Sequence, residues 1–448
     1  MKPTGILFFP AFDWAISPSH PEREERLLYT RDQIFEEGIM DLPQIREYEP
    51  GIASHTDIAR LHFCIPDVDS QITEAHLISA GSALRIADAV MMGEVRNGFA
   101  IVRPPGHHSM TVSHGNRGFC NINNEAIMVE YLRHKYNIKR IAIVDTDVHH
   151  GDGSQEIFWD DPDVLFISFH QDGRTLYPGS GFLDELGGPL AYGTTINLPL
   201  RPRTTDTGIL WALDELIMPL LAEFKPEIVI NSAGQDNHYT DPLADMAFTA
   251  QGYAQLNSRL APDIAVLEGG YSVETALPYI NMGLIMAMAG MDYSALREPD
   301  FDPARFKESS ANLDYIKQMV ERQLTVFRNR EEIIAANRKK GGEFFSTQRS
   351  IFYDTEYISE DQRTKLRNCP HCGGYRIIDS SAQHHDGKYY TAYCISLPSW
   401  ACTDCQNEAR ALYKDILPKT PNLQVFLQDR PANIFRCYDV KSERETVL

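Results

Sequence analysis

Short runs of apolar, β-branched-rich residues recur along the first 290 positions of the chain, and they lack polar alternation. Strands covered on both faces have this pattern, whereas strands with one solvated face alternate between apolar and polar residues. The runs are Phe99–Val102, Ile141–Val144, Val164–Ile167, Ile228–Ile230 and Ile264–Leu267. Helical patterns at Asn124–Lys135 and Thr207–Phe224 lie between them. The alternation predicts an α/β domain over residues 1–290 with a parallel central sheet.

A linker and a packing helix are predicted to follow this domain. Residues 291–304 are rich in Pro and Asp. Apolar side chains then recur at spacings of three and four, which places them on one face of a helix. They are Leu313, Ile316, Val320, Leu324 and Phe327. We expect the linker and helical segment to span residues 291–364, and a small C-terminal module to span residues 365–448.

Composition and charge narrow the class of protein. The chain has 448 residues, of which 43% are apolar and 23% charged, so it is predicted to be globular with two or three domains. A formal net charge of −20 argues against a dedicated binder of nucleic acid or of anionic membranes. The start of the chain lacks a signal-peptide pattern and no long apolar run follows, so we expect a cytoplasmic protein.

Ionisable residues and glycines follow each of the apolar runs directly. In open parallel sheets, ligands bind beyond the carboxyl ends of the strands, so these segments are expected to converge on one crevice. The segments are Arg103–His108, Asp145–Asp152, Ser168–His170, Asn231–Asp236 and Glu268–Tyr271. Such a density of ionisable groups at strand ends is costly to bury without a function.

A metal site is predicted at the end of one run. In an extended segment alternate side chains share a face, so Asp147 and His149 can reach the same ion. Asp236 is the best candidate for a third ligand. Two carboxylates and one imidazole leave an open coordination position, which is typical of catalytic rather than structural zinc.

The adjacent His107 and His108 form a second candidate feature. Neighbouring imidazoles diverge and make poor joint ligands, but they suit general acid–base catalysis when each contacts a carboxylate. Asp145 and Asp152 are available as those partners.

Taken together, these residues resemble the zinc-dependent histone deacetylase superfamily, which includes bacterial deacetylase-like amidohydrolases, acetylpolyamine amidohydrolases and acetoin-utilisation proteins. The matching motifs occur in order over about residues 5–290, and they are closest to the class II and bacterial branch. They are H-P-E-R at 20–23, R-P-P-G-H-H at 103–108, G-F-C-N-I-N-N at 118–124, D-T-D-V-H-H-G-D-G at 145–153, S-A-G-Q-D at 232–236, D-P-L at 241–243 and L-E-G-G-Y at 267–271.

The resemblance implies a fold, a mechanism and residue roles. It implies a three-layer arginase/deacetylase fold and hydrolysis of an acetyl or other acyl amide on lysine or another primary amine. A catalytic zinc would lie on Asp147, His149 and Asp236. His107 and His108 would form the acid–base pair, backed by Asp145 and Asp152 respectively, and Tyr271 would polarise the substrate carbonyl.

The resemblance also implies a substrate tunnel and potassium sites. Gly118 and Phe119 would form one tunnel wall, Tyr177 the opposite wall and Leu243 the rim, with Tyr177 where the family commonly has Phe. One potassium would bind Asp145, the Ser168 hydroxyl and the backbones of Phe169, Asp147 and His149. A second would use backbone oxygens near Phe158, Asp161, Val164 and Thr194, and Arg26 would match an arginine near the acetate exit channel.

Two C-x-x-C pairs mark the C-terminal module. Cys369 and Cys372 form one pair, and Cys402 and Cys405 form the other, which suits a tetrahedral structural zinc in a zinc-ribbon-like fold. The gap between the pairs is long for a ribbon, so we expect a hairpin insertion that turns at Asp386–Gly387. The module is expected to select substrate, to dimerise or to cap the enzyme.

Several functions stay open at this stage. The first is deacetylation of an acylated lysine, with an acetylpolyamine or another small molecule as the alternative substrate. The second is an acyl-amine-binding protein without turnover, which the complete set of site residues disfavours. The third is a nucleic-acid-associated protein led by the Cys-rich module, which the acidic charge makes improbable. A homo-oligomer is compatible with each of them.

Overall fold

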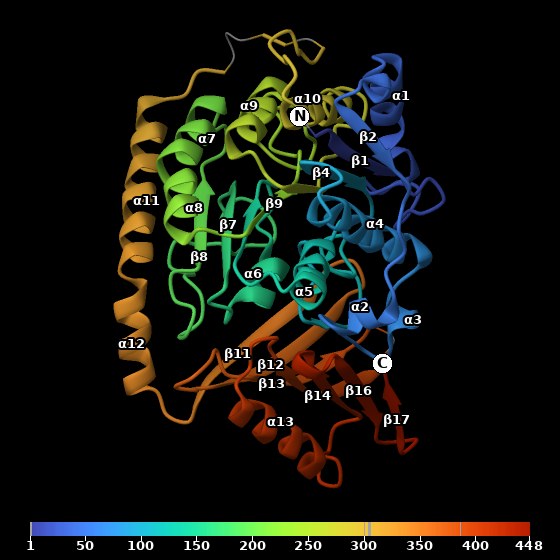
Figure 1. Ribbon diagram of the computed structural model, residues 1–448, viewed down its shortest axis with the longest axis vertical. Helices are drawn as coiled ribbons and strands as arrows, with labels where there is room; N and C mark the ends of the chain where they lie inside the picture. Colours follow the sequence, from blue (N-terminus) through green and yellow to red (C-terminus); the bar gives the residue numbers. More distant parts are fainter. Residues whose placement is uncertain (1, 300, 303–305, 386) are drawn as a thin grey trace.

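The computed structural model describes residues 2–299, 301–302, 306–385 and 387–448. The first part of the chain is built on an eight-stranded sheet in which every neighbouring pair is parallel (Figure 1). The strand order is β2-β1-β4-β10-β9-β6-β7-β8. In chain order the strands are β1 (Thr4–Phe9), β2 (Ile45–Tyr48), β4 (Asn97–Val102), β6 (Ile141–Asp145), β7 (Val164–Gln171), β8 (Thr195–Leu200), β9 (Ile228–Ala233) and β10 (Ile264–Leu267).

Helices cover both faces of this sheet, which confirms the three-layer α/β fold. Successive strand residues point to opposite faces, so Phe99 and Ile101 pack in one core while Ala100 and Val102 pack in the other. The first core also contains residues of α1 (Leu28–Glu36), α7 (Asp206–Ala212), α8 (Met218–Phe224), α9 (Ala250–Leu260) and α10 (Leu277–Ala289). The second contains residues of α4 (Glu74–Met91), α5 (Asn124–Tyr136) and α6 (Asp152–Phe158).

The five apolar runs singled out in the sequence are all strands of this sheet, namely β4, β6, β7, β9 and β10. Three further strands, β1, β2 and β8, were not predicted. They lie at or near the sheet edges, where burial is incomplete or the pattern is broken. In β2 the two central residues are exposed, and β8 contains Pro199, which edge strands tolerate.

Two helices run along the side of the first domain and lead to the second sheet (Figure 1). They are α11 (Ser310–Arg328) and α12 (Arg330–Lys340). In α11 the predicted face is inward, with Ile316, Val320 and Phe327 buried against the first core. The prediction of a packing helix in this segment is therefore confirmed. The short elements α2 (His55–Ala59), α3 (Val68–Gln71), β3 (Phe63–Cys64) and β5 (Val112–Ser113) complete the domain.

The C-terminal part is a seven-stranded sheet with one helix on it. All neighbouring strands are antiparallel except β14 and β15, which are parallel and are joined through α13 (Thr403–Ile416). The strands are β11 (Phe344–Tyr353), β12 (Ile358–Arg367), β13 (Arg376–Gln383), β14 (Tyr389–Leu397), β15 (Gln424–Asp429), β16 (Ile434–Asp439) and β17 (Arg444–Val447). The predicted hairpin between the cysteine pairs is β13–β14, and Asp386 of its turn lies outside the described residues.

This sheet begins earlier than the sequence suggested. The module was expected to start at residue 365, but β11 and most of β12 precede that position and pair with the rest of the sheet. Both strands carry polar residues on their exposed positions, as in Ser346–Arg349. They therefore lack the continuous apolar run that revealed the strands of the first sheet.

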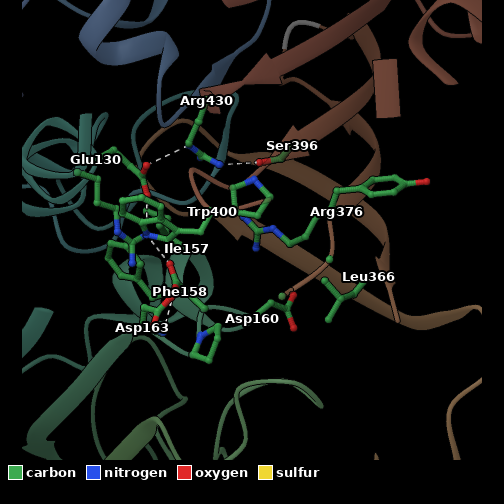
Figure 2. A pocket seen from close by; sticks show the side chains of 17 residues that line it. Glu130, Ile157, Phe158, Asp160, Asp163, Leu366, Arg376, Ser396, Trp400 and Arg430 are labelled. Atoms are coloured by element: carbon green, nitrogen blue, oxygen red, sulfur yellow. Dashed lines mark hydrogen bonds and ion pairs between the residues drawn. The ribbon is translucent and has the colours of Figure 1, made fainter. Parts of the chain in front are cut away.

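Charged residues tie the two parts of the molecule together (Figure 2). The Arg430 guanidinium lies 3.3 Å from Glu130 of α5 and donates to the Ser396 hydroxyl at 3.0 Å. Arg376 contacts Glu156 of α6 at 3.3 Å. A cavity of about 80 Å³ remains between the two parts. Among the described residues, every helix is too short or too polar to span a bilayer.

Candidate active site

The five polar segments converge because their strands are neighbours. β4, β10, β9, β6 and β7 are consecutive in the sheet and parallel, so their carboxyl ends meet along one edge. The segments that follow these strands are the ones predicted to share a crevice. Residues more than a hundred positions apart in the sequence are thereby brought into contact.

The three predicted metal ligands lie together. The Nδ1 atom of His149 is 3.2 Å from Asp147 Oδ1 and 3.1 Å from Asp236 Oδ2. One ligand atom from each of the three residues falls within a group no wider than 4.8 Å. Both aspartates are fully buried. Two buried carboxylates and an imidazole in this arrangement can hold a divalent cation.

The backbone around these residues fits a bound metal. The Gly269 N–H donates to Asp147 Oδ2 at 2.7 Å, and the Val148 N–H donates to Asp236 Oδ1 at 2.8 Å, so both carboxylates are oriented. A Cβ atom at Gly234 would collide with Asp147, and one at Gly269 would collide with Asp236. The site therefore has the donor set and the backbone clearance that a zinc ion needs.

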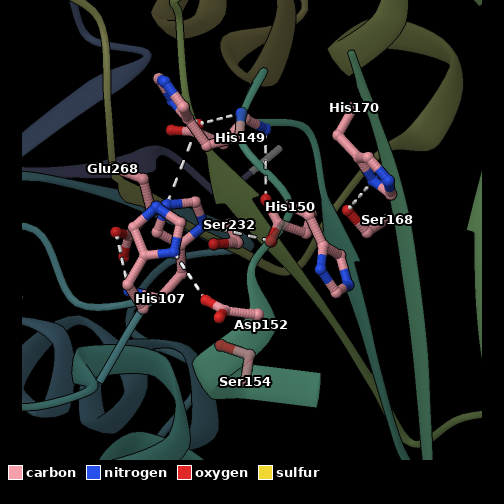
Figure 3. Close-up of polar contacts among 12 residues, drawn as sticks. His107, His149, His150, Asp152, Ser154, Ser168, His170, Ser232 and Glu268 are labelled. Carbon is pink, nitrogen blue, oxygen red and sulfur yellow. Dashed lines mark hydrogen bonds and ion pairs between the residues drawn. The ribbon is translucent and has the colours of Figure 1, made fainter. Parts of the chain in front are cut away.

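Each histidine of the predicted acid–base pair contacts its own carboxylate. Figure 3 shows the polar cluster to which His107 and Asp152 belong. His107 Nδ1 lies 3.2 Å from Asp145 Oδ2, and His108 Nδ1 lies 2.8 Å from Asp152 Oδ1. The two ring centroids are 4.2 Å apart. Each carboxylate fixes the orientation of one ring and leaves its Nε2 atom directed away from that partner.

The surroundings shift the pKa values of the two histidines in opposite directions. Burial would lower the pKa of His107, but the negative charges of Asp147 and Asp145 outweigh it and raise that pKa to about 10. Burial, together with the charge of His107, lowers the pKa of His108 to about 3 despite its contact with Asp152. His108 is therefore neutral at pH 7 and able to accept a proton.

Two supporting residues were missed by the sequence analysis. Arg117 forms an ion pair with Asp152 at 2.5 Å, which fixes the carboxylate behind His108. Glu268 accepts hydrogen bonds from the backbone N–H groups of Gly106 at 2.7 Å and His107 at 3.0 Å. Glu268 stands in the L-E-G-G-Y motif, but nothing in the local pattern around Arg117 points to Asp152.

Tyr271 and the predicted tunnel residues line one cavity of about 230 Å³. Burial raises the pKa of Tyr271 well above its ordinary value, so its hydroxyl stays protonated and can donate a hydrogen bond. The cavity also reaches the candidate metal ligands and both histidines. Its lining residues are Pro105, His107, His108, Gly118, Phe119, Asp147, His149, Leu176, Tyr177, Leu243, Gly269, Tyr271 and Asp354. Asp354 comes from the C-terminal sheet and was not anticipated.

Some of the residues implied for potassium and for the exit channel neighbour this centre, whereas Phe158 and Asp161 of the second potassium segment line the cavity between the two parts of the molecule. Asp145 and Ser168 are partners in the register of β6 and β7, and the Ser168 hydroxyl lies 2.8 Å from His170 Nδ1. In the second potassium segment, the Asp161 carboxylate pairs with Arg133. Arg26 is fully buried, donates to Gly270 O at 2.8 Å and lies 4.9 Å from the Tyr271 ring centroid.

The four cysteines of the C-terminal part form a second compact group. The Sγ atoms of Cys369 and Cys402 are 3.7 Å apart, and those of Cys372 and Cys405 are 3.6 Å apart. Four thiolates at about 2.3 Å from a tetrahedral zinc lie about 3.8 Å from one another, so the spacing fits that ion. The backbone N–H of His371 donates to Cys369 Sγ, as expected for a thiolate ligand.

Comparison with known proteins defines the class of this protein. The histone deacetylase domain matches residues 64–282. A probable deacetylase of Archaeoglobus fulgidus is 47% identical over 325 residues, which cover 66% of this chain and 89% of that protein. The chain therefore belongs to the histone deacetylase family, a family of hydrolytic enzymes. The resemblance inferred from the sequence motifs is confirmed.

More distant relatives are consistent with this assignment. The mouse polyamine deacetylase HDAC10 is 41% identical over 214 residues, which cover 46% of this chain and 32% of that protein. The crystal structure of the HDA15 HD domain matches with a TM-score of 0.63 at 25% identity, and covers 76% of this chain and 99% of that one. The family match ends at residue 282, before the C-terminal sheet.

Proposed function

We propose that this protein removes an acyl group, acetyl first, from the nitrogen of a primary amine by zinc-dependent hydrolysis. One observation carries the proposal: a single cavity is lined by the candidate metal ligands Asp147 and His149, the neutral His108 and the hydroxyl-bearing Tyr271. Asp236 completes the candidate ligand set. This combination provides a Lewis acid, a base and an oxyanion donor at one place.

The residues of the chain have separate tasks in this reaction. A zinc ion held by Asp147, His149 and Asp236 would supply electrophilic activation of the acyl carbonyl and acidify a water molecule. His108 takes the proton of the attacking water, since its low pKa keeps it neutral. The Tyr271 hydroxyl donates a hydrogen bond to the oxyanion that develops on the carbonyl oxygen. His107, or His108 acting again, delivers a proton to the leaving nitrogen.

We assign the remaining ions in the same way. A structural zinc on Cys369, Cys372, Cys402 and Cys405 is supported by sulfur spacings close to those of a tetrahedral site. A potassium ion at Asp145, Ser168 and Phe169 is supported by the pairing of the first two across β6 and β7. Purified protein is expected to contain about two zinc ions per chain.

A substrate panel tests the proposal. The panel holds acetyl-lysine peptides, N-acetylated diamines and polyamines, and longer-chain acyl amines, with acetate release as the readout and a hydroxamate as inhibitor. Hydroxamate-sensitive turnover of at least one class supports the proposal. Tight hydroxamate binding without any turnover favours the acyl-amine-binding alternative, and salt-dependent retention on DNA would favour the nucleic-acid-associated one.

A further inference from the structure

The C-terminal sheet contributes a residue to the mouth of the catalytic cavity. The turn between β11 and β12, residues 354–357, reaches the catalytic domain, and its first residue, Asp354, lines the same cavity as Tyr271 and His108. The long β11–β12 hairpin is drawn in orange in Figure 1, extending from the second sheet toward the first domain. No residue of the family match supplies this carboxylate, because that match ends at residue 282.

Buried contacts fix the turn in place. Tyr353, directly before it, is buried and its hydroxyl donates to Glu360 Oε2 at 2.8 Å and to Val112 O at 3.3 Å. Ile358, directly after it, is fully buried in a small core that also contains Met110 of the catalytic domain. The turn is therefore held from both sides, and the position of Asp354 is set by packing between the two parts of the molecule.

One oxygen of Asp354 forms hydrogen bonds with two other residues that line the cavity. Asp354 Oδ1 accepts a hydrogen bond from the Gly118 N–H at 2.9 Å and another from the Tyr177 hydroxyl at 3.0 Å. Gly118 and Tyr177 both line the cavity. Among the described residues, no donor contacts the other oxygen, Oδ2, and the side chain is half-buried. A carboxylate oxygen thus remains available beside the cavity entrance.

The basic side chains near Asp354 do not neutralise its carboxylate. The Arg117 guanidinium lies 5.7 Å from the Tyr177 ring centroid, but it is already ion-paired with Asp152. Burial lowers the pKa of the nearby His20, whose ring packs on Phe119, although Glu22 and Asp354 act in the opposite direction. Neither of these two basic side chains forms an ion pair with Asp354.

We propose that Asp354 is a specificity-determining residue that selects acylated amines carrying a second, positively charged nitrogen beyond the acylated one. The inference rests on the proposed function, since the acyl group must lie at Tyr271 for the rest of the substrate to pass Asp354. The alkyl chain runs between the walls formed by Phe119 and Tyr177, and the cationic nitrogen pairs with Asp354 Oδ2. Acylated diamines and acyl-lysine with a nearby ammonium group share this chemistry.

Matched substrates measure this selection. N-acetyl-1,5-diaminopentane and N-pentylacetamide have the same chain and differ in the terminal ammonium group. The wild-type enzyme is expected to prefer the cationic substrate, and Asp354→Asn is expected to reduce that preference about 5- to 10-fold, mainly through KM. The amide still offers an oxygen to Gly118 and Tyr177, so turnover of the neutral substrate should fall less than turnover of the cationic substrate.

Two further measurements identify which ammonium group of the substrate pairs with Asp354, and they control for general effects of charge. A series of acetylated diamines of increasing length and a pair of acetyl-lysine compounds with free or blocked α-amine show which ammonium position Asp354 reads. Glu356→Gln removes a charge from the same turn, at a side chain whose contact is the Asn116 N–H, and should leave the preference unchanged. An equal loss of preference in Glu356→Gln would overturn the assignment to Asp354.

Failure of the inference and failure of the proposed function give different results. If turnover occurs but Asp354→Asn keeps the full preference, or lowers kcat equally for both substrates, the inference is wrong and the hydrolytic function stands. Calorimetry with alkyl hydroxamates, with and without a terminal ammonium group, needs no turnover. Charge-selective binding that depends on Asp354 in an enzyme without turnover would retain the inference and reject hydrolysis, and absence of hydroxamate binding would reject both.

Discussion

At the scale of single residues, two side chains that are adjacent in the sequence have pKa values shifted in opposite directions by their surroundings. His107 and His108 are adjacent, yet the pKa of the first is raised to about 10 by Asp147 and Asp145 in spite of burial, and that of the second is lowered to about 3 by burial and by His107. The chemistry of this pair is set by burial and by the charged groups that the fold places around each ring.

Replacing Tyr271 by Phe should lower kcat by about 10²–10³-fold, because one preorganised donor to the developing oxyanion is lost. The metal content should stay at the wild-type value, since Tyr271 is not among the candidate ligands. Acetate release and elemental analysis of the same preparation check both statements. A Tyr271→Phe enzyme with full activity would remove the hydroxyl from the mechanism.

Arg117 is a positioning residue, since it contacts Asp152 and not the reacting atoms. Arg117→Met should lower kcat about tenfold or more with little change in KM, and it should also reduce thermal stability, because it leaves the buried Asp152 carboxylate without its cation. The kcat and thermal stability of Arg117→Lys, which keeps the positive charge but loses the planar guanidinium group, should lie between those of the wild type and of Arg117→Met. The kcat and KM values of both variants, with thermal melts, are the measurements. An unchanged kcat in Arg117→Met would show that Asp152 does not need this partner.

At the scale of elements, the β11–β12 hairpin is attached to α6 by buried charge. Glu156 lies 2.8 Å from Arg349 of β11 and 3.3 Å from Arg376 of β13. Burial would raise the pKa of Glu156, but the two arginines lower it from 4.5 to about 2. A carboxyl group whose pKa is depressed by folding contributes stability above its unfolded pKa and loses it as the pH falls toward the folded value.

Glu156→Gln should therefore destabilise the protein at pH 7, by on the order of 3 kcal/mol. The difference in melting temperature between wild type and variant should shrink as the pH falls from about 4.5 toward 2, because the unfolded wild-type chain takes up a proton on Glu156 in this range while the folded carboxylate stays ionised. Thermal melts over a pH series measure it. Asp379, a carboxylate on the same sheet that accepts a hydrogen bond from Asn422 and not from the partners of Glu156, offers a control as Asp379→Asn. A difference independent of pH would contradict the ion-pair origin of this stability.

At the scale of the whole molecule, the second sheet has its own group of candidate zinc ligands, separate from the candidate ligands in the first domain. Cys402→Ser should reduce the zinc content from about two ions to one per chain and lower the melting temperature, because metal binding to four thiolates is coupled to folding. Turnover measured well below the melting temperature should persist. Cys437→Ser, at a thiol outside the four-cysteine group, is the matched control. Loss of both zinc ions in Cys402→Ser would show that the two sites are not independent.

The sequence by itself determined the parallel sheet and the main catalytic constellation. The five apolar runs are long enough to identify as buried strands, and parallel strands end at the same edge, so Asp147, His149, Asp236, His107 and Tyr271 were expected to meet. The strands β2, β11 and β12 were not predicted, because strands with exposed positions resemble surface segments. The edge strand β8 is buried, but Pro199 interrupts its pattern.

Only the tertiary structure decided what the second sheet does at the active site. Gly118 and Asp354 are separated by 236 positions, and the bond between them depends on how two independently patterned parts of the chain pack. The same holds for Arg117 with Asp152 and for Glu156 with its arginines. Local periodicity reports burial within an element, but ion pairs between elements depend on their relative placement, which no local pattern records.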